Sequence, residues 1–433
     1  MKKITLSILI FLIIVLAISA TTHAATHCVS PSGSGSKTGA DWNNAYANIP
    51  ASLVRGDTYY IADGSYGNHT FGDAVSGTTA IVIRKATAAD HGVDTGWNNS
   101  YGAGQAVFGS WRFAHANSGY YEFEGYSAAV TKGCGIKVQM PLESNLYSSG
   151  AAAIIFGGGS TANFPYMTFK YLEVSGPYST GTYSSSLYRT GIFFSQNDGS
   201  NNTSHSTVSH CWIHNGCTTP IADGDGNSYL TIEYCELCDM NDTGGIDHAD
   251  VYVVASNNGI FRYNYCHNYV PCGLFMQGGT SVSGFQVYGN VFDGGGKTAT
   301  QFITCNTGCT LTNWQVYNNT IVDVDSPFNL ASPSVIGCKF YNNLFCGHSG
   351  SGGSGWDTQN SLTVSSSVFV NYAGKDFHLQ SHTTSGTTLS SPYNIDMDGV
   401  TRVPGSWDIG AYEYVAGGGG ITPPSPPNNL RMR

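Results

Sequence analysis

A short pattern of apolar and polar positions recurs six times between residues 208 and 347. Each copy has an apolar residue three places before a Cys or Asn, and a second core-type residue two places after it. The copies are VSHCWIHN (208–215), IEYCELCD (232–239), FRYNYCHN (261–268), VYGNVFDG (287–294), VYNNTIVD (316–323) and FYNNLFCG (340–347). Successive Cys or Asn positions are 24, 29, 26, 29 and 24 residues apart. Short strands at such intervals predict a solenoid of stacked strands joined by turns of unequal length.

The Cys or Asn position should form a column of like residues along the solenoid. Its members are Cys211, Cys235, Asn264, Asn290, Asn319 and Asn343. One repeat has too few apolar residues to bury alone, but stacking on a coil about 4.8 Å away makes the apolar column continuous. Asn suits a polar turn there, because its amide bonds to the next coil and it tolerates left-handed backbone. We therefore expect Asn290 and Asn319 to be immediate neighbours along the axis.

A second apolar strand accompanies each repeat, so a coil carries at least two strands. These strands are GIFFS (191–195), DVYVV (250–254), GLFM (273–276), QFIT (301–304) and PFNL (327–330). Helical periodicity is almost absent, which argues against leucine-rich and ankyrin repeats. Propeller blades need about 40–45 residues each, and these repeats are much shorter.

The repeats resemble those of right-handed parallel β-helix proteins of the pectate-lyase-like superfamily. TYYIADGSYG (58–67), after the helix-like DWNNAYANIPASL (41–53), is similar to the N-terminal cap of such proteins. The segment from DFHLQ (376–380) to WDIGAYEY (407–414) is similar to the one that closes them. The resemblance implies an all-β, single-stranded right-handed parallel β-helix with an N-terminal cap over residues 25–414. It leaves activity open, since the superfamily includes lyases, hydrolases, esterases, epimerases and non-catalytic surface proteins.

The ends of the chain predict export. Residues 1–24 have the form of a secretory signal peptide, with Lys2 and Lys3 before a short apolar run and Ala24 before the expected cut. We expect a secreted protein that has no membrane association after removal of the signal. Residues 415–433 are a Gly- and Pro-rich tail or linker, and whether it leads to a partner domain stays open.

The charge balance argues against nucleic acid as a ligand. The net charge of −10 becomes −12 without Lys2 and Lys3, and residues 190–345 contain only Arg262, Lys297 and Lys339 as basic residues. The expected partner is a polysaccharide or a cell-surface glycan, bound by a monomer.

All twelve cysteines lie after the signal peptide, so export permits disulfides. Cys211 and Cys235 occupy one column, and stacking would place their Cα atoms about 4.8 Å apart, a separation that a disulfide accepts. Two alternatives stay open for them, a disulfide or a stacked pair of thiols. Cys305 and Cys309 could close a small loop. Zinc is less favoured, since Cys235-x-x-Cys238 has no second cysteine pair at ligand spacing.

Polar residues that could carry chemistry are densest between Asp223 and Asp250. In GGIDHADVYVV (244–254), strand alternation predicts that Ala249, Val251 and Val253 face the core. The alternate residues would face solvent, and glutamines of the next coils would extend their row as a sugar-binding surface. The exposed row is therefore expected to contain His248, Asp250, Tyr252, Gln277 and Gln301.

Two chemistries fit this row. A lyase must neutralise a uronate carboxylate and remove the neighbouring proton. With so few basic residues, neutralisation would need Ca²⁺, and His248 or Arg262 would act as the base. The expected calcium ligands are Asp239, Asp242, Asp247 and Asp250. A hydrolase needs two carboxyl groups instead, and Asp223, Asp225, Asp247 and Asp250 could supply them.

The resemblance transfers no catalytic residue. Ile246-Asp247-His248 is similar to a fragment of a pectate-lyase motif, but the accompanying arginine-rich motif is absent. Asp223-Gly-Asp225-Gly-Asn227 is better interpreted as a turn than as a calcium loop, since Ser228 and Tyr234 replace the expected Gly and Glu. The predicted protein is an extracellular polysaccharide lyase or glycoside hydrolase with Asp247, His248, Asp250 and Arg262 as catalytic candidates. The alternatives are a non-catalytic adhesive glycan-binding protein and a structural spacer.

Overall fold

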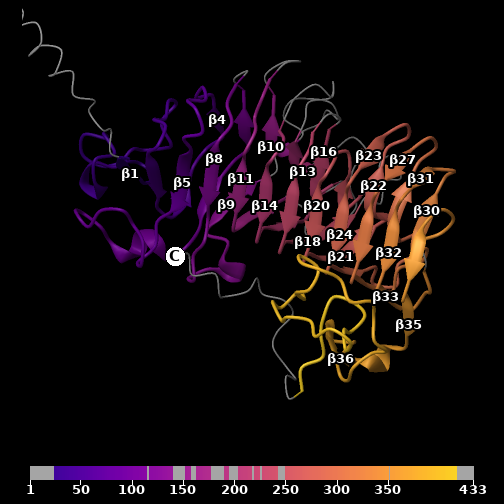
Figure 1. The fold of residues 1–433 in the computed structure, drawn as a ribbon. Coiled ribbons are helices and arrows are strands. Elements are labelled where there is room, and N and C mark those ends of the chain that lie inside the picture. Colours follow the sequence, from indigo (N-terminus) through magenta and orange to yellow (C-terminus); the bar gives the residue numbers. More distant parts are fainter. Residues whose placement is uncertain are drawn as a thin grey trace, which may run out of the picture.

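A computed structural model describes residues 24–114, 117–139, 152–157, 162–176, 190–194, 203–216, 219–224, 227–241, 249–350 and 352–416. The chain winds into an elongated parallel β-helix whose strands stack along one axis (Figure 1). This confirms the predicted all-β, single-stranded parallel β-helix.

Three long parallel sheets form the walls of the solenoid. In stacking order, sheet A is β1 (Thr26–Val29), β2 (Thr58–Ile61), β5 (Ile81–Lys85), β8 (Tyr121–Glu124), β11 (Thr168–Lys170), β14 (Thr207–Ser209), β17 (Thr231–Glu233), β20 (Ile260–Arg262), β24 (Gln286–Tyr288), β28 (Gln315–Tyr317), β32 (Lys339–Tyr341) and β34 (Asp357–Gln359). Sheet B is β3 (Gly64–Ser65), β6 (Ala106–Phe108), β9 (Ile136–Gln139), β12 (Leu172–Ser175), β15 (Trp212–His214), β18 (Glu236–Asn241), β21 (Tyr265–Val270), β25 (Val291–Asp293), β29 (Thr320–Val322), β33 (Leu344–Cys346) and β35 (Leu362–Val364). Sheet C is β4 (His69–Phe71), β7 (Trp111–Phe113), β10 (Ala152–Phe156), β13 (Thr190–Phe194), β16 (Ile221–Asp223), β19 (Tyr252–Val253), β22 (Cys272–Met276), β26 (Gln301–Cys305) and β30 (Phe328–Leu330).

Smaller elements decorate these walls. They are a parallel sheet of β23 (Ser281–Ser283), β27 (Thr310–Thr312) and β31 (Ser334–Ile336), an antiparallel pair β36 (Phe369–Asn371) and β37 (Asp376–Leu379), and the 3₁₀ turns η1 (Trp42–Asn44), η2 (Asn99–Gly102), η3 (Thr131–Gly133) and η4 (Ser366–Val368). The helix-like 41–53 segment therefore forms only the single turn η1, because the backbone becomes extended at Ala45.

Each predicted repeat spans the corner between sheets A and B and contains two short strands rather than one. The residue just before the Cys or Asn column makes the corner by taking a left-handed backbone, with φ between 52° and 65° in all six repeats. Tyr263 and Asn318 are examples, and Gly289 fills the same position, where a side chain would meet Tyr263. The left-handed residue thus precedes the Asn column instead of occupying it.

The Asn column forms the predicted ladder. The Nδ2 atom of Asn264 donates to Oδ1 of Asn290 at 3.1 Å, and Nδ2 of Asn290 donates to Oδ1 of Asn319 at 2.9 Å. Asn319 repeats this contact with Asn343 at 2.9 Å. The predicted stacking of Asn290 on Asn319 is confirmed.

The inward positions of all three sheets fill one continuous core. The first apolar position of each repeat is at most 1% exposed, and its members are Val208, Ile232, Phe261, Val287, Val316 and Phe340. They pair in register from strand to strand, so each coil covers the apolar surface of the one before it.

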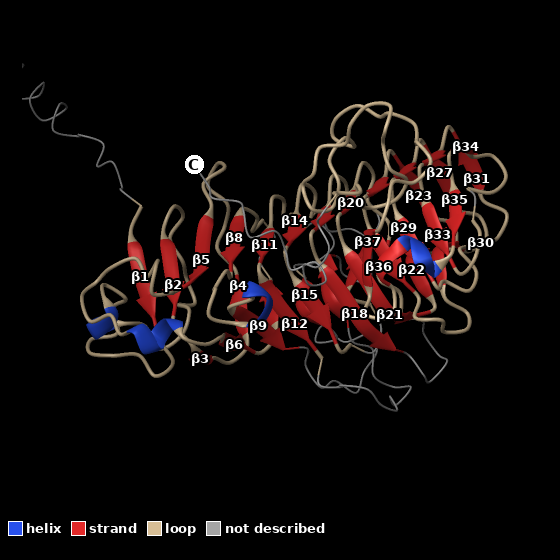
Figure 2. Cartoon of the chain, turned by 90° about the horizontal axis from the view of Figure 1, so that it is seen from below, coloured by secondary structure: helices blue, strands red, loops and turns tan. Residues whose placement is uncertain are grey.

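Residues 369–412 cover the flank of the solenoid instead of adding a coil. Phe369, Phe377 and Tyr412 pack with outward-facing Val291 and Val322 of sheet B. β36 and β37 accordingly lie beside β29 and β33 when the molecule is seen from below (Figure 2). This segment, 369–412, is called the flank segment below, and it packs on the outward face of the later strands of sheet B.

The described cysteines are free thiols rather than disulfides. The eleven cysteines among the described residues are all free and buried, so the disulfide alternative for Cys211 and Cys235 is not borne out there. Burial raises the pKa of the Cys235 thiol well above its usual value, and the neighbouring Cys211 raises it further. Cys305 and Cys309 are likewise free.

The predicted signal peptide and tail lie outside the described residues, apart from Ala24 and residues 415–416. Within the part of the chain that is described, no helix has the length and apolar character to cross a membrane.

Candidate functional site

The described residues of the predicted row at 248–252, Asp250 and Tyr252, do not face solvent. Asp242, Asp247 and His248 lie outside the described residues. Asp250 and Tyr252 are 2% and 1% exposed, so their predicted exposure is wrong. The physical reason is that regular alternation starts only at Tyr252, where β19 begins, after Ala249 has formed an antiparallel bridge with Val270.

Tyr252 belongs to a buried polar network. Its hydroxyl donates to Oδ2 of Asp223 at 3.2 Å, and Asn227 Nδ2 donates to Oδ1 of Asp223 at 2.6 Å. Burial raises the pKa of Asp223 to about 6, although the hydrogen bonds from Ser256, Asn227, Gly224 and Tyr252 oppose that rise. Asp223 and Asn227 are thus joined directly by a side-chain hydrogen bond, and Asp225 between them lies outside the described residues.

The two glutamines do not continue one row. Gln277 is exposed and follows the last residue of β22, whereas Gln301 pairs with Cys272 at the first residue of that strand. Cys272 and Gln277 are five residues apart, which corresponds to about 16 Å along an extended strand. Gln301 also accepts a hydrogen bond from Cys272 Sγ at 3.5 Å.

Arg262 and Asp239 are both engaged by neighbours. The Nε atom of Arg262 lies 2.8 Å from Oε2 of Glu233, and Nη1 donates to the Tyr288 hydroxyl at 2.9 Å. Burial lowers the pKa of Arg262, but Glu233 and Tyr288 outweigh it and raise that pKa, which disfavours Arg262 as a proton acceptor. Asp239 accepts a hydrogen bond from Asn268. Asp239 lies on β18 of sheet B, whereas Asp250 lies just before β19 of sheet C, so these two predicted calcium ligands belong to different walls of the solenoid.

A cavity of about 570 Å³, lined largely by charged and polar residues, lies between sheet B and the edge of the flank segment. Strands β18, β21 and β25 form its floor, and the turns after β25 and between β36 and β37 form its rim. The lining residues are Lys132, Glu236, Tyr265, His267, Asn268, Asp293, Gly295, Lys297, Gly374 and Lys375.

Three lysines from separate segments meet at this cavity. They are three of the eight lysines in residues 24–416. Lys132 forms an ion pair with Glu236, and Lys375 Nζ lies 2.7 Å from Oδ2 of Asp293. Lys297 forms no ion pair among the described residues. Burial lowers the pKa of Lys297, and the charges of Asp239 and Asp293 only partly offset that effect.

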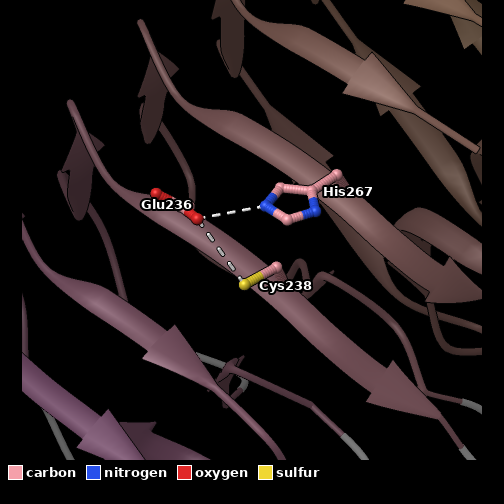
Figure 3. A group of neighbouring side chains, drawn as sticks. All are labelled: Glu236, Cys238 and His267. Carbon is pink, nitrogen blue, oxygen red and sulfur yellow. Dashed lines mark hydrogen bonds and ion pairs between the residues drawn. The ribbon is translucent and has the colours of Figure 1, made fainter. Parts of the chain in front are cut away.

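Glu236 and His267 line the cavity floor and form a cluster with the buried Cys238 (Figure 3). Cys238 and His267 are register partners on β18 and β21, and Glu236 is two residues before Cys238, on the same face of its strand. His267 Nε2 lies 3.1 Å from Glu236 Oε1, and Cys238 Sγ lies 3.9 Å from the same oxygen. Burial opposes ionisation of Glu236, but His267 and Lys132 outweigh it and lower its pKa.

The preceding strands of sheet B hold a second charged group, which lies outside the cavity lining. Glu173 accepts hydrogen bonds from Lys137 Nζ at 2.5 Å and from Gln105 Nε2 at 2.7 Å. Burial opposes its ionisation, yet these bonds and that of His214 lower its pKa to about 2. The ring of Trp212 stacks on His214 with 3.7 Å between centroids, and Lys132 Nζ lies 5.1 Å from the Trp212 ring.

Sequence reasoning missed this cavity. One signal was available in the repeats, because the first and third residues after the Cys or Asn column face outward on sheet B. In IEYCELCD and FRYNYCHN these positions are Glu236, Cys238, Tyr265 and His267. No local signal could have brought Lys132 and Lys375 to the same place, since turns far apart in the chain supply them.

Comparisons with known proteins identify the fold class. No family model matches the sequence, and no curated protein matches it either. Among solved structures, the fold is similar to that of pectate lyase Pel9A, with a TM-score of 0.56, 14% identity, and coverage of 91% of this chain and 98% of that one. A PL6 family polysaccharide lyase, Pedsa3628 from Pseudopedobacter saltans, matches with a TM-score of 0.40, 11% identity, and coverage of 79% and 94%. The likeness to Pel9A confirms the expected fold, a pectate-lyase-like parallel β-helix.

Proposed function

We propose that this protein is an extracellular polysaccharide lyase that binds a uronate-containing chain in the cavity beside the flank segment. The observation that supports this proposal is the meeting of Lys132, Lys297 and Lys375 in a chain with a net charge of −10. The chain has few lysines, and the placement of three of them around one cavity suits a ligand that carries carboxylates. Pel9A is a pectate lyase by name, which agrees with a carbohydrate substrate for this fold.

Lys297 has the properties of the base in such a reaction. β-Elimination removes the proton next to the uronate carboxylate and breaks the bond to the neighbouring glycosidic oxygen, which then receives a proton. A lysine can accept the first proton only when it is neutral, and burial favours the neutral form of Lys297. Lys132 and Lys375 would hold the carboxylate, where positive charge stabilises the electron density that develops beside it. Water in the open cavity would supply the proton that the leaving oxygen receives.

A calcium-assisted centre at Asp247, His248 and Asp250 is a separate proposal for the same reaction class. It would place the chemistry in the segment just before β19 of sheet C, with Asp239 and Asp242 as further ligands. Of the four proposed calcium ligands, Asp239 and Asp250 are described, and Asp250 is buried. The lysine cavity is preferred because its charged groups border a described space that a sugar ring fits.

A polysaccharide panel with and without a chelator tests the proposal. Lyase activity appears as absorbance of unsaturated uronate, and we expect it to survive removal of calcium. Lys297→Met should reduce the rate at least 100-fold, whereas the matched control Lys339→Met, at an exposed position of β32, should not.

Other outcomes would contradict the lysine cavity as the centre. New reducing ends without absorbance would indicate a hydrolase, and binding without cleavage would favour the adhesive alternative. Loss of cleavage in His248→Ala, together with full activity in Lys297→Met, would move the centre to residues 247–250.

A further inference from the structure

The cluster of Glu236, Cys238 and His267 offers one nitrogen, one sulfur and one oxygen ligand. Zinc prefers this mixture, with bond lengths of about 2.0–2.1 Å to nitrogen, 2.0–2.2 Å to oxygen and 2.3 Å to sulfur. All three ligand atoms of Glu236, Cys238 and His267 lie within 4.8 Å of one another. Calcium would be a poor fit, because it takes six to eight oxygen ligands.

Two of the three separations between the ligand atoms are close to those of a tetrahedral ion. With those bond lengths and tetrahedral angles, a nitrogen and an oxygen ligand stand about 3.4 Å apart, and a sulfur and an oxygen about 3.6 Å. The observed values are 3.1 Å from His267 Nε2 to Glu236 Oε1 and 3.9 Å from Cys238 Sγ to that oxygen. Both lie within about 0.3 Å of the tetrahedral values, so small side-chain rotations would complete the geometry.

The cluster sits on rigid backbone. β18 and β21 pair over five positions, which fixes Cys238 beside His267. The imidazole of His267 stacks on Tyr265 with 4.4 Å between ring centroids, and Lys132 binds the second oxygen of Glu236. Such supporting contacts orient ligands before an ion arrives.

We propose that Glu236, Cys238 and His267 bind one Zn²⁺ ion whose fourth coordination position opens into the cavity. Glu236 and His267 line the cavity, while Cys238, 2% exposed, lies behind them. Three protein ligands with one open position are the arrangement of zinc sites that act on substrates. The cysteine pattern of the sequence gave no second pair for zinc, but the fold supplies a histidine from the next coil. The ion would exchange with the Cys238 proton, so binding releases that proton to the buffer.

Metal binding by the full mature chain tests this site directly. The chain is first stripped with a chelator and dialysed, and Zn²⁺ is then added and the excess removed. We expect one zinc per chain by elemental analysis, with proton release in calorimetry repeated in two buffers. Co²⁺ in place of zinc should give a near-ultraviolet thiolate-to-metal absorption band. Cys238→Ser should abolish that band and weaken zinc binding at least tenfold, and His267→Gln should weaken it similarly. His205→Gln, an exposed histidine on a different corner, serves as the control.

The result that would overturn the site is a chain that takes up no stoichiometric zinc, or a cobalt band that persists in Cys238→Ser. Thermal melting of each variant shows whether it is folded. Should Cys238→Ser fail to fold, His267→Gln decides the matter, because its position is partly exposed. Loss of the zinc site would leave the lyase proposal standing, since Lys297 does not depend on a metal.

Discussion

The side-chain amide of Asn290 donates a hydrogen bond to Oδ1 of Asn319 at 2.9 Å, although 29 residues separate them. The same Nδ2 atom also donates to the carbonyl of Phe261 at 2.8 Å, and both asparagines are 0% exposed. Each rung of the ladder therefore satisfies polar groups of its own coil and of its neighbours. Buried donors and acceptors of this kind cannot form a replacement hydrogen bond with water when a partner is removed.

Asn319→Ala should accordingly destabilise the solenoid. It leaves the backbone N–H of Asn290 and the carbonyl of Val287 without their bonds from Asn319, at a cost of about 2–4 kcal/mol. Urea unfolding followed by circular dichroism measures the change. Asn329→Ala, at an exposed position of β30, should stay within about 0.5 kcal/mol of the parent. Equal midpoints for both variants would contradict a stabilising ladder.

The ladder was predictable from sequence because stacking repeats one environment at each coil, so like residues recur at like positions. The left-handed corner was predicted at the Asn column, one residue too late, because Asn tolerates that backbone better than a residue such as Tyr263 does. Strand alternation failed at Asp250 and Tyr252 for a different reason. It assumes a regular strand throughout, and β19 begins only at Tyr252.

The cavity was not predictable in the same way. Its walls come from the flank segment and from turns, whose positions depend on packing between distant parts of the chain. Lys375 reaches Asp293 only because Phe369 and Phe377 pack on outward-facing side chains of the solenoid. The pattern of apolar residues in 369–412 does not say which part of the solenoid that segment covers.

The lyase proposal predicts a specific pH dependence. Cleavage requires neutral Lys297, so kcat/KM should rise with pH through an apparent pKa below the ordinary lysine value of 10.5. Asp239→Asn removes a charge that opposes the lowering, so its profile should shift to lower pH. Initial rates of uronate absorbance between pH 6 and pH 10 check both statements. A profile that is flat over this range would contradict Lys297 as the base.

Asp223 should make the fold less stable as the pH rises from acid. Its carboxyl pKa is raised from 3.8 to about 6 by burial, so the folded chain binds the proton more tightly than the unfolded chain. Stability should fall between about pH 4 and pH 6 and then level off, by about 1–3 kcal/mol from this group. Urea midpoints of the parent and of Asp223→Asn at pH 4, 5, 6 and 7 measure it. The variant should lose this step, and an unchanged step would assign it to other groups, such as Asp396, whose pKa is also raised to about 6.

His378 should stabilise the flank segment at neutral pH and lose this effect only at alkaline pH, unlike Asp223, whose effect is lost in the acid range. Its Nδ1 lies 2.5 Å from Asp376 Oδ1 and its Nε2 lies 2.7 Å from Asp398 Oδ2. Burial lowers the pKa of His378, but the two carboxylates outweigh it and raise that pKa from 6.5 to about 9. The stabilisation is therefore complete below about pH 6.5 and is lost as the pH rises through 9. Because the side chain is 21% exposed, solvent screening reduces the effect to about 1–3 kcal/mol.

Hydrogen exchange of residues 369–412 at pH 6 and pH 9.5, corrected for the intrinsic rate, measures this stabilisation. Protection in the parent should decrease at the higher pH, whereas His378→Gln should show weak protection at both values. His382→Gln is the matched control, since that histidine is more exposed and contacts Asp408 in the same segment. Lys375 lies three residues before His378, so loosening of this segment should also weaken substrate binding and raise KM above pH 9. Equal loss of protection in the parent and in His378→Gln would contradict the role of the imidazolium.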